Sequence, residues 1–152
     1  ILSYGDKSMI ERAMPKDAAI IAKMAVKMWE NHTIDELTIK FEGILDAEDS
    51  AIFICFVDSQ AIGFAQCQLR HDYVEGTESS PVGYLEGIFV EQEYRHKGYA
   101  KVLLSKCEEW AKEQGCLEFA SDCELDNSNS FAFHMNMGFS EANRIICFIK
   151  SL

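Results

Sequence analysis

The feature that most constrains this fold is a strand–helix–strand unit in the second half of the chain. Val82–Val90 is an apolar run typical of a buried strand, and Leu117–Asp122 predicts a second one. Between them Ala100–Gln114 predicts a helix, because its apolar residues repeat at i, i+4, i+7 and i+8: Leu103, Cys107, Trp110 and Ala111. Gly115 stands where a helix usually ends. Two strands joined by a helical crossover are parallel neighbours, so the fold belongs to the α/β class.

The first half of the chain adds strands of the opposite direction. Met9–Ala13 predicts a short strand, and the apolar face of a first helix comprises Ile21, Ala25, Met28 and Trp29. Thr33 and Glu36 form a capping box that opens a second helix, with the apolar stripe Leu37, Phe41, Ile44 and Leu45. Ala51–Val57 and Ala61–Arg70 are separated by a short polar turn and predict an antiparallel hairpin.

The remaining segments complete a single-domain prediction. His71–Pro81 is polar and predicts a loop, Asn127–Met137 a short helix ending at Gly138, and Arg144–Lys150 a last strand. We expect a mixed, mostly antiparallel sheet with a central parallel pair and helices on both faces. The domain should span residues 9–152, and residues 1–8 are set apart as a flexible or vector-derived segment.

Composition excludes several classes of function. The 152 residues include 14 Lys and Arg against 25 Asp and Glu, a formal net charge of −11, which disfavours nucleic-acid binding. The longest apolar run, Ala51–Val57, is far shorter than the roughly 20 residues that span a bilayer. The six cysteines show no C-x-x-C spacing and lie mostly in apolar runs, which favours reduced, buried thiols and a cytoplasmic location. The four histidines share no metal-ligand spacing, so we expect no metal site.

A strand, a tight turn and a helix start follow one another in Ile88–Ala100. The first amides of a helix lack intrahelical partners and carry the positive end of the helix dipole, so a phosphate fits there. Gly98 allows close approach of the backbone, and Arg95 and Lys97 add positive charge in an acidic chain. From residue types alone, an ordinary helix start is an equally good interpretation.

The six residues from Arg95 to Ala100 match the pattern R-x-x-G-x-A. This pattern resembles the pyrophosphate-binding motif of the GCN5-related N-acetyltransferase (GNAT) superfamily, and the order of elements resembles that fold over nearly the whole chain. The resemblance implies acetyl-CoA as cosubstrate and a parallel pair of strands that splays at its site. It implies these cofactor contacts: the backbone of Ile88, Phe89 and Val90 on the pantetheine arm, Arg95, His96, Lys97, Gly98, Tyr99, Ala100 and Lys101 around the pyrophosphate, and Asn127 beyond the fifth strand.

The same resemblance implies a proton donor near the last helix. Many members carry a tyrosine four residues before a Gly-Phe pair, where it protonates the departing thiolate. Here Gly138 and Phe139 form that pair, and the tyrosine's position holds His134. A histidine can supply this proton, or the thiolate can leave without a dedicated acid.

Three segments resemble the aminoglycoside 6'-N-acetyltransferase branch of the superfamily: Arg70–Thr77, Tyr84–Val90 and Glu118–Asp122. That resemblance implies a polycationic amine as acceptor, hence antibiotic resistance, and an acceptor site lined by Trp29, Tyr73, Glu86 and Asp122. It also implies a homodimer, in which Tyr73 reaches into the partner's site. Where this branch has a carboxylate near the last strand, the present chain has Asn143.

The residues themselves are compatible with this chemistry. Glu86 interrupts an apolar strand, and a carboxylate there requires a partner or a ligand. Glu86 and Asp122 lie on neighbouring strands, where either carboxylate could orient an ammonium and take its proton. The acceptor could equally be a polyamine, an amino sugar or a protein amine, and a non-catalytic CoA-binding module is a further alternative.

Overall fold

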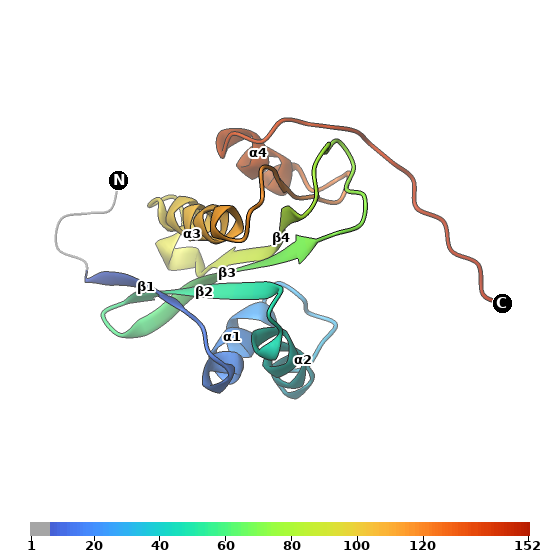
Figure 1. Ribbon diagram of the computed structural model, residues 1–152. Coiled ribbons are helices and arrows are strands. Elements are labelled where there is room, and N and C mark those ends of the chain that lie inside the picture. Colours follow the sequence, from blue (N-terminus) through green and yellow to red (C-terminus); the bar gives the residue numbers. More distant parts are fainter. Residues whose placement is uncertain (1–6) are drawn as a thin grey trace.

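A five-stranded mixed sheet forms the centre of the molecule, and the computed structural model describes residues 7–152 (Figure 1). Its strands lie in sequence order: β1 (Ser8–Arg12), β2 (Ser50–Val57), β3 (Gln60–Arg70), β4 (Val82–Val90) and β5 (Phe119–Ala120). The first four are antiparallel to their neighbours, and β4 and β5 are parallel. The α/β class, the hairpin and the parallel pair are thus confirmed.

Helices cover both faces of this sheet (Figure 1). On one face lie α1 (Ala18–Ala25) and α2 (Ile34–Asp46), and on the other α3 (Tyr99–Glu113) and α4 (Ser128–Asn136). Short 3₁₀ turns precede α1 and α3 at Pro15–Asp17 and Gln92–Tyr94. Thr33 and Glu36 form the expected capping box of α2.

The sheet separates two apolar cores. Leu103, Cys107 and Trp110 of α3 pack with Cys67 and Leu85 on one face. On the other face Ile21 of α1 and Phe41 of α2 pack with Phe64 and Phe89. Both β3 and β4 contribute side chains to the two cores, so packing on both faces fixes the position of these strands. The residues that they carry at the edge of the cores are fixed with them.

The parallel pair is much shorter than the sequence predicts. Leu117–Asp122 was expected as a strand, but β5 keeps only Phe119 and Ala120, paired with Gly83 and Tyr84. Beyond Tyr84, β4 continues to Val90 with no strand of the described chain paired on that side. The two strands therefore part at Leu85, and a fork opens between them.

Two predicted segments differ in the structure. The helix expected to include Met28 and Trp29 ends at Ala25, because the amides of Lys27 and Met28 bond three residues back instead of four. The strand expected at Arg144–Lys150 is absent: this segment is exposed and leads away from the body (Figure 1). A strand needs a neighbour, and the described part of this chain offers none to these residues.

Candidate active site

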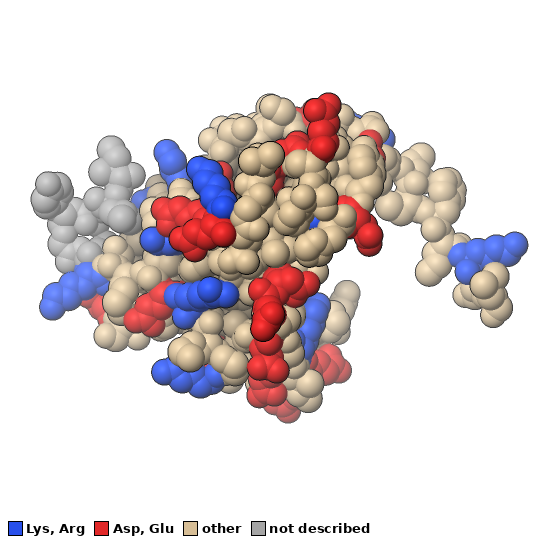
Figure 2. Space-filling model, viewed as in Figure 1, with Lys and Arg blue, Asp and Glu red and all other residues tan. Residues whose placement is uncertain are grey.

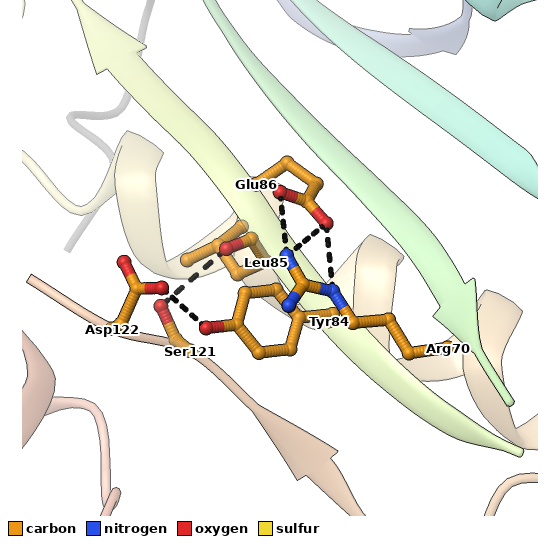
Figure 3. Close-up of polar contacts among 6 residues, drawn as sticks. All are labelled: Arg70, Tyr84, Leu85, Glu86, Ser121 and Asp122. Atoms are coloured by element: carbon orange, nitrogen blue, oxygen red, sulfur yellow. Dashed lines mark hydrogen bonds and ion pairs between the residues drawn. The ribbon is translucent and has the colours of Figure 1, made fainter. Parts of the chain in front are cut away.

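Glu86 lies on β4 just inside the fork, and its partner is Arg70 at the end of β3. The Arg70 Nη2 group donates to both carboxylate oxygens, at 2.9 and 3.1 Å, and Nε donates to one of them at 3.2 Å (Figure 3). The Glu86 side chain is 23% exposed. Arg70 is thus the partner that a glutamate in an apolar strand requires. The exposed part of the Glu86 side chain leaves room for a ligand.

Tyr84 connects this ion pair to Asp122. The guanidinium carbon of Arg70 lies 3.5 Å from the centre of the Tyr84 ring, and the Tyr84 hydroxyl donates to Asp122 Oδ2 at 2.5 Å (Figure 3). Burial, and then the hydrogen bond to Asp122, raise the pKa of Tyr84 well above its ordinary value. Tyr84 therefore stays a neutral donor, and Asp122 is held facing the fork.

Trp29 lies next to this cluster although α1 ends before it. A Cβ atom added to Gly87 would lie 3.2 Å from the Trp29 ring, so the ring packs on the backbone of β4 directly after Glu86. Phe41 stacks on Trp29 at a centroid distance of 6.2 Å. The structure thus places Trp29 beside the residue that follows Glu86, while Tyr84 links the Glu86–Arg70 pair to Asp122.

Tyr73 does not join that cluster within the chain. It lies 75% exposed in the loop between β3 and β4, and its hydroxyl accepts a weak hydrogen bond from the Gly76 amide at 3.4 Å. Among residues 7–152 no recorded interaction links it to Glu86 or Asp122. The place of Tyr73 in an acceptor site therefore stays a prediction.

The start of α3 has the geometry of an anion site. Gly98 is the N-cap with φ +93°, no side chain caps the helix, and His96 also has a positive φ of 61°. Left-handed residues at a helix start form the kind of turn in which backbone amides can converge on an anion. The positive φ explains the requirement for glycine at residue 98.

The free edge of β4 runs from the fork toward this helix start. The amide of Glu91 donates to Ile62 of β3 at 2.7 Å, so by alternation Phe89 also directs its backbone toward β3. The backbone groups of Ile88 and Val90 face the other, unpaired side. Of the three residues expected to pair with pantetheine, Ile88 directs both backbone groups to this side, whereas Val90 offers its amide and its carbonyl accepts from Arg95.

Arg95 folds back on the strand rather than over the helix start. Its Nε donates to the carbonyl of Val90 at 2.8 Å, and its guanidinium lies over the Phe89 ring. His96, Lys97 and Lys101 are exposed near the helix start. Asn127 caps α4 by accepting from the Ser130 amide at 3.0 Å, which leaves its amide nitrogen for the predicted cofactor contact.

His134 projects from α4 toward β5. Its Nδ1 lies 2.7 Å from the Ser130 carbonyl oxygen and its Nε2 lies 2.7 Å from Ser121 Oγ. Ser121 Oγ in turn is 3.5 Å from the carbonyl oxygen of Leu85, across the fork (Figure 3). His134 thus reaches the fork through Ser121.

Three residues of the site were missed by the sequence analysis. Arg70 ends a strand and Tyr84 lies inside one, so neither stands out without knowledge of the register. Ser121 follows directly after β5, and only the splay of the strands gives it a role. The signal that could have found Arg70 is the single glutamate in an apolar strand, which requires a nearby cation.

The cysteine prediction needs a correction. Cys55, Cys67, Cys107 and Cys116 are buried free thiols, but Cys123 and Cys147 are exposed. Burial raises the pKa of the Cys55 thiol to about 11.

Residues 7–152 contain no group of three or more side chains suited to hold a metal ion, and no helix among them could cross a bilayer. On the face shown in Figure 2, Lys and Arg are scattered among acidic side chains outside the grey atoms.

Comparisons with known proteins agree with this geometry. The profile of the Acetyltransferase (GNAT) family matches residues 18–139. An aminoglycoside N(6')-acetyltransferase type 1 of Stenotrophomonas maltophilia is 38% identical, over 91% of this chain and 90% of that protein. Its namesake from Salmonella typhimurium is 43% identical, over 82% and 86%.

Solved structures are similar over almost the whole chain. The aminoglycoside N-acetyltransferase AAC(6')-Iy in complex with CoA superposes with a TM-score of 0.94, 36% identity and full coverage of both chains. The same enzyme with a bisubstrate analogue, CoA-S-monomethyl-acetylneamine, gives a TM-score of 0.91, 37% identity and coverage of 95% and 99%.

The chain belongs to the GNAT family of acetyltransferases. Within that family, the relatives that match it over most of its length place it in the aminoglycoside 6'-N-acetyltransferase branch.

Proposed function

We propose that this protein transfers the acetyl group of acetyl-CoA to the 6'-amine of aminoglycosides, by direct attack within a ternary complex. The observation that carries this proposal is the fork between β4 and β5. It has an unpaired strand edge leading to an uncapped helix start on one side, and the carboxylates of Glu86 and Asp122 on the other. A cofactor and a cationic acceptor can thus meet at one point.

Acetyl-CoA would enter along β4. The backbone of Ile88 and the amide of Val90 would pair with the amides of pantetheine, as a further strand would, while the Val90 carbonyl accepts from Arg95. The start of α3 would bind the pyrophosphate, since the helix dipole and the left-handed turn at Gly98 both favour an anion there. Asn127 supplies a contact from the start of α4.

The acceptor would bind on the carboxylate side. Its ammonium groups pair with Glu86 and Asp122, and its sugar rings pack on Trp29. A net charge of −11 favours a multiply charged cation over neutral amines. Acetylation neutralises one of those charges, which would make the enzyme a resistance determinant.

The direct test is substrate-dependent release of CoA. Purified protein is given acetyl-CoA with a kanamycin-type aminoglycoside, with spermidine, with an amino sugar or with a lysine peptide, and free thiol is measured. Turnover confined to aminoglycosides supports the proposal. Preferential turnover of spermidine or peptide would assign the alternative acceptors, and binding of CoA without turnover would indicate a non-catalytic module.

The proposal includes a homodimer formed through the C-terminal segment 144–152. This segment carries exposed apolar side chains, among them Ile146 at 80%, Phe148 at 91% and Ile149 at 98%. No backbone hydrogen bond of the described chain involves residues 145–152. Among residues 7–152, no strand lies beside the outer edge of β5. In a dimer, the segment 144–152 of each copy would pair with the outer edge of β5 in the other copy. Both the segment and the edge would then have a strand beside them.

The direction of the segment supports that arrangement. Asn143 donates to Glu75 at 2.7 Å and Ala142 packs on Gly76, so the segment leaves the body beside the loop that holds Tyr73. An interface built here would carry Tyr73 toward the partner's acceptor site.

The free cysteines of residues 7–152 suit a reducing compartment, and we propose a cytoplasmic location, to be tested by cell fractionation.

A further inference from the structure

The reaction requires a proton to move between two atoms at the fork. When a neutral amine attacks the thioester carbon, its nitrogen becomes positively charged and must lose a proton. When the carbon–sulfur bond breaks, the electron pair leaves on sulfur, which must gain one. One proton-transferring group between the two atoms can take the proton from the nitrogen and deliver a proton to the sulfur.

Both carboxylates of the site are already engaged. The two oxygens of Glu86 accept from Arg70, and Asp122 accepts from the Tyr84 hydroxyl. Such carboxylates are suited to hold the acceptor's ammonium groups. Ser121 with His134 is a further pair of groups that reaches the fork, and its hydrogen bonds suit it to relay a proton.

The hydrogen bonds fix the tautomer of neutral His134. A carbonyl oxygen only accepts, so the contact of 2.7 Å with the Ser130 carbonyl favours a proton on Nδ1 over the longer contact of 3.4 Å with Ser130 Oγ, in which the hydroxyl could donate. Nε2 therefore presents its lone pair, and the contact of 2.7 Å with Ser121 requires the serine hydroxyl to donate. The lone pairs of Ser121 Oγ are then free to accept a proton from a group in the fork.

Position and packing favour the same role. Ser121 is the first residue after the last registered pair of β4 and β5, and its hydroxyl spans the fork toward Leu85 (Figure 3). The His134 ring is half-buried and lies edge-on to Phe133 and Phe139, at centroid distances of 5.4 and 5.1 Å. It is therefore held in place while Ser121 faces the reacting atoms.

We infer that Ser121 and His134 carry the proton from the acceptor's nitrogen to the sulfur of CoA. In the first half, the nitrogen gives its proton to Ser121 Oγ as Ser121 passes its own to His134 Nε2. In the second half, the imidazolium returns a proton to Ser121 Oγ as Ser121 protonates the departing sulfur. His134 ends in the tautomer in which it began, and no other reactant is consumed.

This inference rests on the proposed function and makes Ser121 a catalytic residue and His134 a positioning residue behind it. The test compares Ser121→Ala, Ser121→Thr, His134→Gln and the double variant Ser121→Ala/His134→Gln, with Ser105→Ala on the exposed side of α3 as the matched control. Steady-state kcat and both KM values are measured with acetyl-CoA and the aminoglycoside.

We expect Ser121→Ala to lower kcat about 100-fold with both KM values within about threefold, and Ser121→Thr to restore most of kcat. Because the two residues act as one unit, the double variant should be no slower than the worse single variant. A plot of kcat against the fraction of D₂O in the solvent should be curved for the wild type, because two protons move in one step. The same plot should be linear for Ser121→Ala.

A kcat within threefold of wild type in Ser121→Ala would overturn the relay, as would multiplicative losses in the double variant. Nitrogen NMR of His134 gives a readout independent of turnover, and a proton on Nε2 of the neutral ring would also overturn it. If the wild type itself released no CoA with any amine, the proposed function would fail and the relay with it. If the wild type is active, the kcat values of the variants test the relay alone and leave the proposed function standing.

Discussion

Arg70 and Glu86 form a two-pronged ion pair across β3 and β4, with one guanidinium nitrogen 2.9 and 3.1 Å from the two carboxylate oxygens. The pair lies where β4 loses its neighbour, and it is only partly buried. The guanidinium holds the Glu86 side chain in a fixed orientation. A further cation can approach the same carboxylate from the open side.

Replacing Glu86 should therefore affect the acceptor more than the cofactor. In Glu86→Gln, Arg70 loses its counter-charge and repels an incoming ammonium. We expect the acceptor KM to rise about tenfold or more, since a charge-assisted contact contributes roughly 1.5–3 kcal/mol. The KM for acetyl-CoA should change less than about twofold. Glu113→Gln, at the far end of α3, makes the same charge change and should leave both values unaltered; equal losses for both substrates in Glu86→Gln would argue against an acceptor role.

The helix start at Gly98 offers a test with a built-in control. Gly98→Asp places a negative charge and a Cβ where we expect the pyrophosphate, and CoA affinity should fall about 30-fold or more, roughly 2 kcal/mol. Gly115 at the other end of α3 has a similar φ of +90°, with nothing within 4 Å of an added Cβ. Gly115→Asp thus carries the same backbone cost without the ligand effect. Calorimetric titration with CoA should separate the two variants, and equal affinities would contradict the placement of the cofactor.

Tyr84 should contribute a stability that is lost in alkali. Burial and the bond to Asp122 raise its pKa in the folded protein, so the folded state holds the phenolic proton more tightly than the unfolded state. This contribution is complete below the unfolded pKa of about 10 and declines as the pH rises beyond it. Denaturant unfolding between pH 8 and 11 should show a shallower decline in Tyr84→Phe than in the wild type. Tyr73→Phe, which removes an exposed phenol, should follow the wild type; an identical decline in Tyr84→Phe would refute the assignment.

Removal of residues 144–152 should produce a monomer. The truncated chain keeps Asn143 and its contact with Glu75, so the loop that holds Tyr73 remains anchored. Light scattering should give twice the chain mass for the chain of residues 1–152 and one chain mass for the truncated form. In the untruncated chain the amides of residues 145–150 should exchange slowly with deuterium, because strand pairing protects them. Fast exchange of these amides in a dimer would place the interface elsewhere.

The parts of the fold that the sequence predicts well are those stabilised by local signals. The capping box at Thr33, the stripe of α3 and the alternation in β3 each specify an element before any tertiary contact forms. The last strand could not be predicted in place, because Ile145–Ile149 have strand-forming side chains but no neighbour in the described chain. Trp29 was assigned to a helix by its spacing, yet its position depends on packing against Gly87.

The candidate site was predictable only in part for a similar reason. Glu86 stands out as a charge in an apolar strand, and Gly98 stands out within its motif. Arg70, Tyr84 and Ser121 owe their roles to the register of β3 with β4 and to the fork beyond Tyr84. Register is a property of the sheet as a whole, and a single segment does not reveal it.

The central claim is that the fork brings acetyl-CoA and an aminoglycoside amine together. The most direct measurement is incubation of the purified protein with acetyl-CoA and a kanamycin-type aminoglycoside, followed by thiol titration and NMR of the product. We predict one CoA released for each acetyl group transferred, with the acetyl group on the 6'-nitrogen. Folded protein that binds CoA yet leaves every aminoglycoside unmodified, or acetylates a different nitrogen, would contradict the account.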